Sequence, residues 1–146
     1  ADIRSYSRTV FAYALGLGIL LAVILGVGKY SGFLLDFFTT DVLTQMELSK
    51  LLDILILSQP LNALVFAADG VLQGASEFAY QAKTMVLSVA ITFVSFVCLN
   101  NLGLGLGNDI LINVWYSLVI LQIMRGLTSL YKLVERDGPI DLLAKL

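Results

Sequence analysis

The sequence predicts an all-α integral membrane protein with four transmembrane helices, and three observations support this prediction. Hydrophobic side chains make up 58% of the 146 residues, whereas charged side chains make up only 14%. A soluble domain of this size would expose far more charge. Charged residues also divide the chain into four apolar blocks, each long enough to cross a hydrocarbon core of about 30 Å at about 1.5 Å per residue. These runs are continuous rather than alternating, which disfavours a transmembrane β-barrel.

The four apolar blocks set the expected helices and the domain organisation. We expect a four-helix transmembrane bundle within residues 1–137 and a short C-terminal tail over 138–146, with spans at approximately 9–28, 50–76, 84–100 and 109–132. The second and fourth blocks each contain one charge, Asp69 and Arg125. Arg125 is near enough to the end of its helix for its guanidinium to extend to the membrane surface.

Two local features modify this simple picture of four straight spans. The segment KYSGFLLDFFTTDVLTQ, residues 29–45, is too apolar for a loop in water. We expect it to lie along the membrane surface, with Phe33, Phe37 and Phe38 in contact with lipid. Pro60 falls inside the second span, and its missing N–H and its ring predict a hinge or kink there.

The distribution of basic residues predicts the orientation in the membrane. With four spans, both termini lie on the same side, and basic residues are concentrated on that side. Seven are expected there and two on the other side: Arg4, Arg8, Lys83, Arg125, Lys132, Arg136 and Lys145 against Lys29 and Lys50. Both termini are therefore expected to face the cytosol, or the stroma if the membrane is organellar.

Small residues recur at helical spacing in the first two spans. The first span carries Ala14, Gly18, Ala22 and Gly26, and the second carries Ala63, Ala67, Gly70 and Gly74. In lipid, such strips let helix backbones approach closely. We therefore interpret both strips as helix-packing surfaces, with the alternative that the glycines let helices slide or bend during transport.

A polar seam follows one face of the second helix. Its members are Gln59, Asn62, Asp69 and Gln73, with Glu77 just beyond the helix. Such a seam should face protein or a watery cavity, because a carboxylate at membrane depth costs about 2.5–3.5 kcal/mol on insertion scales. Burial favours the protonated form of a carboxylic acid. Asp69 is therefore a candidate for ion or proton coupling, with Asn62 as a second candidate. The alternative is that Asp69 only hydrogen-bonds a neighbouring helix.

The chain offers little chemistry of other kinds. It contains no histidine and a single cysteine, Cys98, so we expect no catalytic residue, no metal site and no enzyme activity. The glycine-rich GLGLG at 103–107 lacks the spacing of a nucleotide-binding loop. A net charge of −2 without a basic patch argues against a nucleic-acid partner.

Several segments resemble the multidrug and toxic compound extrusion (MATE) transporters, in particular their DinF-like branch. The resemblance is carried by Gln59-Pro60-Leu61-Asn62-Ala63, Asp69-Gly70, Gly74 and Ser76-Glu77-Phe78-Ala79-Tyr80. Glu77 stands where the family more often has aspartate. FFTTDV at 37–42 and VWYSLVILQIMRGLTSLY at 114–131 are similar to other segments of the family.

The resemblance implies a sodium- or proton-coupled antiporter fold of twelve helices in two lobes, with alternating access between them. This chain is similar to helices 9–12 only. Asp69 is the ion-coupling position that the resemblance carries over, and Asn62 is a less direct match.

Two functions follow from this partial match. In the first hypothesis, the chain is a transporter-derived accessory subunit that does not transport and packs within a larger membrane complex, such as one in a plastid thylakoid. Lipid, carotenoid or chlorophyll could then line its exposed faces, besides the expected contacts with membrane lipids and other subunits. In the second, the chain is the C-terminal part of an antiporter that exports organic solutes.

Overall fold

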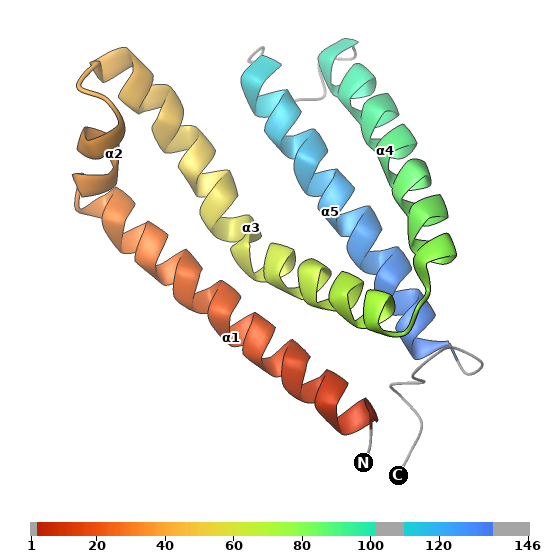
Figure 1. Cartoon of the computed structure of the whole chain (residues 1–146). Coiled ribbons are helices and arrows are strands. Elements are labelled where there is room, and N and C mark those ends of the chain that lie inside the picture. The colour runs from red at the N-terminus through yellow and green to blue at the C-terminus, as the bar shows by residue number, and fades with distance from the viewer. Residues whose placement is uncertain (1–2, 102–109, 136–146) are drawn as a thin grey trace.

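The computed structural model describes residues 3–101 and 110–135, and this part of the chain consists of helices joined by short turns (Figure 1). The helices are α1 (Ile3–Tyr30), α2 (Phe33–Phe38), α3 (Val42–Gly74), α4 (Phe78–Asn101) and α5 (Ile110–Val134). All except α2 are long and apolar enough to cross a membrane. The chain is therefore an all-α integral membrane protein, as the sequence predicted.

The observed helices extend beyond the predicted spans at several ends. α1 begins at Ile3 rather than at residue 9, and α3 begins at Val42 rather than at residue 50. Hydropathy marks only the part of a helix that lipid surrounds, whereas polar residues can continue the helix into the interface. The start of α3 is fixed by Asp41, whose carboxylate accepts hydrogen bonds from the Thr44 amide and hydroxyl. These bonds, the hydroxyl first, lower the pKa of Asp41. The predicted tail, 138–146, lies outside the described residues.

The segment between α1 and α3 is a short helix rather than an irregular loop. Gly32 has φ = 77°, a left-handed conformation that glycine adopts without a steric penalty, and it separates α1 from α2. The Asp36 carboxylate accepts a 3.0 Å hydrogen bond from the side-chain amide of Gln45, and this bond links α2 to the first turn of α3. The rings of Phe33, Phe37 and Phe38 are exposed. That they contact the membrane surface stays a prediction.

The helices form an open row in the order α1, α3, α5, α4 (Figure 1). α1 packs along α3, α3 along α5, and α5 along α4. Among the described helices, the backbone of α1 does not approach that of α4 or α5 closely.

α3 is the longest helix and it is not straight. Figure 1 shows that it changes direction near its middle, where Pro60 lies within the helix. A proline inside a helix removes one backbone hydrogen bond and clashes with the preceding turn, which bends the helix. α1 packs against α3 before and after this bend, since Lys29 binds Asp53 and Phe11 packs against the cluster of Ala68 and Leu72.

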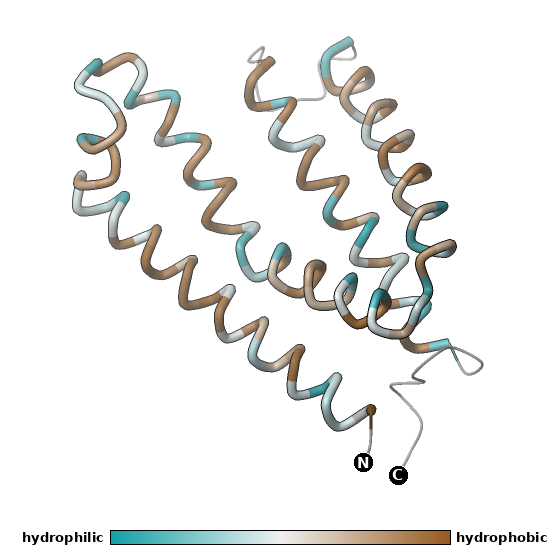
Figure 2. Tube along the Cα trace, viewed as in Figure 1, coloured by the Kyte–Doolittle hydropathy of each residue, from teal (hydrophilic) through white to brown (hydrophobic). Residues whose placement is uncertain are grey.

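The buried core of the described structure is small. Its buried cluster consists of Ala68, Leu72 and Leu133, with Phe11 and Val71 packed against it. Most other large apolar side chains are exposed. Figure 2 shows apolar residues along all four long helices, with hydrophilic residues interrupting α3 and α5 in mid-helix. Such an apolar exterior suits contact with lipid or with further membrane helices.

The predicted small-residue strips make fewer contacts than we expected. Gly18 lies against α3, where an added Cβ would stand 2.8 Å from the Ala63 Cβ. Ala14, Ala22 and Gly26 are only partly buried. A Cβ added at Gly26, Gly70 or Gly74 would meet nothing within 4 Å, so these three glycines do not pack against another helix of the described chain. Instead, Gly126 of α5 faces α3, with the Val65 Cγ2 2.9 Å from its added Cβ.

The turn between α3 and α4 contains a strained residue. Ser76 has φ = 63°, which places its Cβ in the unfavourable left-handed region. The Ser76 amide donates to the Gln73 carbonyl at 3.0 Å and the Glu77 amide to the Leu72 carbonyl at 3.1 Å. This pattern closes a helix in which glycine usually occupies the left-handed position.

Replacing Gly18 by alanine should destabilise the chain by about 1–3 kcal/mol, the usual cost of overpacking. The new Cβ would also lie 2.9 Å from the Pro60 Cα, which is backbone and cannot move easily. Gly16→Ala is the matched control, because a Cβ there would have no neighbour within 4 Å and alanine favours a helix over glycine. Thermal unfolding in a mild detergent measures both variants. Equal melting would contradict the close approach of α1 to α3.

Replacing Ser76 by glycine should stabilise the chain by about 0.5–1 kcal/mol, because removing the Cβ relieves the left-handed strain and only part of the gain is lost to unfolded-chain entropy. Thermal unfolding in a mild detergent measures this variant. Ser49→Gly, inside α3, is the control and should lower the melting temperature. A lower melting temperature for Ser76→Gly would show that residue 76 does not have the left-handed conformation.

Candidate functional site

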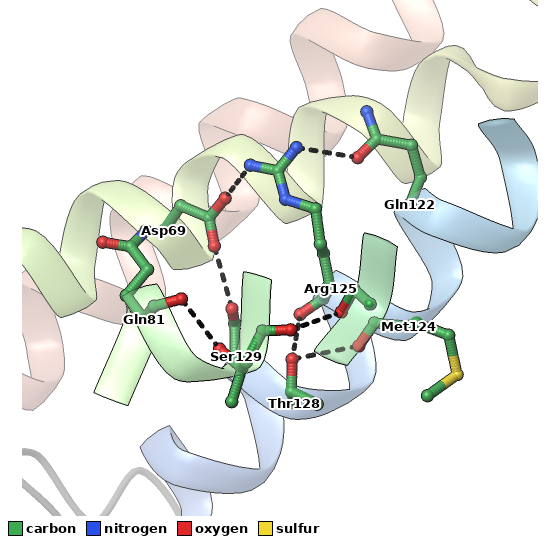
Figure 3. A network of polar contacts seen from close by, with 9 residues as sticks. Asp69, Gln81, Gln122, Met124, Arg125, Thr128 and Ser129 are labelled. Carbon is green, nitrogen blue, oxygen red and sulfur yellow. Dashed lines mark hydrogen bonds and ion pairs between the residues drawn. The ribbon is translucent and has the colours of Figure 1, made fainter. Parts of the chain in front are cut away.

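The candidate site is a charged cluster between α3 and α5, built around Asp69 (Figure 3). Arg125 donates a hydrogen bond from Nη2 to the Asp69 Oδ2 and forms an ion pair with this carboxylate. Ser129, one turn after Arg125 on the same face of α5, donates a 2.8 Å hydrogen bond to the Asp69 Oδ1. Both carboxylate oxygens are thus held by α5.

The arginine of this pair has partners on both helices. Its Nη1 donates to the Gln122 Oε1 at 3.3 Å, and its guanidinium carbon lies 5.7 Å from the centre of the Phe66 ring, within the range of a cation–π interaction. The Arg125 side chain is only 19% exposed. We expected this side chain to extend along α5 to the membrane surface. It does not, because Asp69 offers a counter-charge inside the protein.

Pairing changes the electrostatics of the cluster. An isolated charge in lipid is costly, whereas an opposite charge at hydrogen-bond distance offsets much of that cost. The Asp69 side chain is only 9% exposed. Asp69 and Arg125 therefore form an ion pair without net charge that is mostly shielded from solvent. Asp69 is not a lone carboxylate in the membrane.

The depth of the cluster follows from its place along the two helices. Asp69 lies five residues before the end of α3 at Gly74, and Arg125 nine residues before the end of α5 at Val134. At about 1.5 Å per residue, these separations are roughly 8 and 13 Å. The pair is therefore in the half of the helix row next to the termini, rather than at its centre.

A cavity of about 320 Å³ adjoins the pair. Asp69 and the α5 residues Arg125, Thr128 and Ser129 form one part of its wall, and α4 contributes Phe78, Gln81, Ala82, Thr84 and Met85. A further hydrogen bond joins α4 to α5, where the Tyr80 hydroxyl donates to the Thr128 carbonyl at 2.8 Å. Within the described residues, no group of His, Cys, Asp and Glu side chains could hold a metal ion.

The other residues of the predicted polar seam do not all join this cluster. Asn62 is half-buried near α5. Its Nδ2 lies 3.5 Å from the Ser58 Oγ, and its buried Oδ1 has no hydrogen-bond partner in the described structure. The backbone of Gln59 faces α1 at Gly18, Gln73 is exposed, and Glu77 is half-buried in the turn before α4. Asn62 nevertheless lines a cavity that shares Arg125 with the cavity beside Asp69.

Sequence reasoning missed the residues that complete the cluster. Gln122, Arg125 and Ser129 share one face of α5, at spacings of three and four residues, and an arginine in an apolar block is the signal that could have suggested a partner for Asp69. A second ion pair was also missed: Lys29 at the end of α1 binds Asp53 on α3. Here Lys29 is 10% exposed and Asp53 is 63% exposed.

The fold and the cluster together define a polytopic membrane protein in which charged side chains of neighbouring spans meet inside the helix row. Comparison with known proteins narrows this class. The chain is 35% identical to Protein DETOXIFICATION 42 of Arabidopsis thaliana over 130 residues, which cover 89% of this chain and 24% of that protein. It is 30% identical to Protein DETOXIFICATION 45, chloroplastic, of the same plant, covering 90% of this chain and 22% of that protein.

A third relative, Protein DETOXIFICATION 43 of A. thaliana, is 33% identical over 82 residues, which are 56% of this chain and 14% of that protein. No family model and no solved structure matches the chain. The resemblance to the MATE family is confirmed, since these relatives are MATE proteins, and the chain is a MATE-family sequence. It spans about a quarter of the length of the curated relatives that it matches over most of its own length.

Replacing Asp69 by asparagine should destabilise the chain by about 3–5 kcal/mol, because the change leaves the buried Arg125 without its counter-charge. Arg125→Gln should have a similar effect, whereas the double variant should recover much of the loss. Unfolding by a denaturing detergent measures all three proteins. If the two single effects simply add, Asp69 and Arg125 do not interact. Glu47→Gln is the control for loss of one carboxylate, and it should cost no more than about 1 kcal/mol because Glu47 and its partner Lys50 are both exposed.

Proposed function

We propose that the chain forms part of a cation-coupled, MATE-type transporter and supplies one side of a helical lobe. Its relationship to the DETOXIFICATION proteins supports a transport role. The observation that carries the proposal is the ion pair of Asp69 and Arg125, which joins two spans beside a cavity. Charged residues inside membrane helices commonly mark ion and substrate pathways.

The open row of helices supports the need for further membrane helices. Large apolar side chains are exposed along α1 and α4, and alternating access requires two bodies that move about a shared site. In the proposed assembly, α1–α5 form part of one such body. The match to helices 9–12 of a twelve-helix transporter stays part of this proposal.

The proposed coupling step is a proton transfer at Asp69. Protonation of the Asp69 carboxylate would remove its negative charge, so that the ion pair with Arg125 is lost and the guanidinium can turn toward the adjoining cavity. Deprotonation would restore the contact between α3 and α5. The two states differ in a charged contact between helices, which is the kind of difference that a bound proton can control.

A second candidate is the accessory, non-transporting subunit, and one observation favours it. Both carboxylate oxygens of Asp69 already have partners within the chain, so this residue can have a purely structural role. In that case, subunits of a larger complex would cover the open faces of the row. Two relatives carry the description "chloroplastic", which supports a plastid membrane for either candidate, with both termini on the stromal side.

The test of the transport proposal is proton-coupled flux by the protein as cells produce it, with all segments that accompany this chain. Membrane vesicles carrying Asp69→Asn should lose at least about 90% of the solute-dependent proton flux, because the asparagine side chain cannot take up and release a proton as a carboxylate does. The flux is measured with a pH-sensitive dye in the vesicle lumen, during addition of a panel of organic cations and anions. Glu47→Gln, which removes an exposed carboxylate of α3, is the matched control and should retain the flux.

The outcomes separate the two candidates. Wild-type-like flux in the Asp69→Asn vesicles, at equal protein amounts, would overturn the coupling role of Asp69. If the unmodified protein shows no flux with any solute and native mass spectrometry finds it in a stable stoichiometric complex, the accessory-subunit function replaces the transporter function.

A further inference from the structure

Three neighbouring cavities form one groove along α5. The cavity beside Asp69, of about 320 Å³, shares Arg125 with a second cavity of about 210 Å³. The second shares Leu118 and Leu121 with a third, of about 370 Å³. The shared residues lie on one face of α5, at spacings of three, four and seven residues. We call this continuous surface the α5 groove.

α3 and α4 form the two walls of the α5 groove. They diverge from the turn that joins them, and α5 lies between them (Figure 1). Ser58 and Asn62 line the α3 side, whereas Val89 and Phe93 line the α4 side. The groove is thus a feature of the described helices themselves, formed where α3 and α4 fail to meet.

The α5 groove is polar at one end and apolar at the other. At the end near the termini lie Gln81 and the pair of Asp69 and Arg125 (Figure 3). The opposite end is lined by Phe93 and Val114, together with Val89, Thr92, Phe96, Ser117, Leu118 and Leu121. The hydroxyl of Thr92 donates to the Ser88 carbonyl and that of Ser117 to the Asn113 carbonyl, so neither offers a donor to a ligand at this end.

We propose that the α5 groove binds one glycerolipid molecule as a resident ligand, with its ester region beside Arg125 and an acyl chain along Leu118 and Leu121. The hydrogen bonds described for Arg125 use two of its N–H groups, whereas a guanidinium has five. The others can donate to ester oxygens, which are acceptors only. Because Asp69 already balances the charge of Arg125, the site does not require an anionic headgroup.

The length of the groove agrees with this occupant. Ser129 at the polar end and Val114 at the apolar end are fifteen residues apart on α5, or about 22 Å along the helix axis. One leaflet of a bilayer, with its headgroups, is about 20–22 Å thick. Gln81 lies in the first turn of α4, which places the polar end near a membrane interface, where a lipid headgroup belongs.

The proposal does not rest on transport, and it is tested by photolabelling of the whole protein. Purified protein in detergent is mixed with a phosphatidylcholine that carries a diazirine in one acyl chain, irradiated, and analysed for labelled residues by mass spectrometry. Label should concentrate on Phe93, Leu118 and Leu121. Leu118→Trp fills the groove and should reduce this labelling about tenfold, because several methylene contacts are lost.

Leu127→Trp is the matched control. Leu127 lies nine residues after Leu118, which is half a turn out of phase on the same helix, and both leucines are exposed. Labelling of the groove should persist in this variant. The proposal is overturned if the unmodified protein is labelled as strongly at Leu127 as in the groove, since the lipid is then ordinary solvent, or if Leu118→Trp leaves groove labelling unchanged. The comparison of Leu127 with the groove residues uses the unmodified protein only. A misfolded Leu118→Trp variant therefore cannot obscure the result.

Discussion

The contact between α3 and α5 through Asp69 and Arg125 is the constraint on which the arrangement of the described helices depends. Apolar burial between helices has little value in lipid, so specific contacts decide which helices meet. Here the ion pair, the Ser129 hydroxyl and the close packing of Gly126 against Val65 act along one helix interface. α4 joins the row through α5, and α1 joins it through α3.

Membrane proteins keep charged groups where these groups have partners, and this chain does so with very little core. Its buried cluster contains only small and medium apolar side chains, Ala68, Leu72 and Leu133. The same region holds the charged pair, so packing and electrostatics are concentrated near the termini-side ends of α3 and α5. The opposite ends of these helices are held less closely, which is why a long groove opens over α5.

Much of the fold could be predicted from the sequence, because the membrane imposes a simple rule on composition. Four long apolar blocks predicted four membrane-spanning helices. Asp69 was recognisable as a candidate site residue because it is a carboxylate among apolar residues. The open row could not be predicted, since helix order depends on which polar groups pair across helices. Arg125 and Asp69 are 56 residues apart in the chain, and periodicity within one helix carries no information about a partner on another. The packing role of Gly70 and Gly74 stays a prediction, since a GxxxG spacing permits close packing but the described residues place no second helix against them.

Two of the charged residues of α3, one on each side of its bend, pair with different helices. Before Pro60, Asp53 is attached to Lys29 of α1; after it, Asp69 is attached to Arg125 of α5. α1, however, contacts both parts of α3, because Gly18 lies against Pro60 and Ala63 and Phe11 packs against the cluster of Ala68, Leu72 and Leu133. A displacement of α1 would therefore reach both parts of α3 directly, and through Leu133 it would reach α5 without passing through the proline-containing turn.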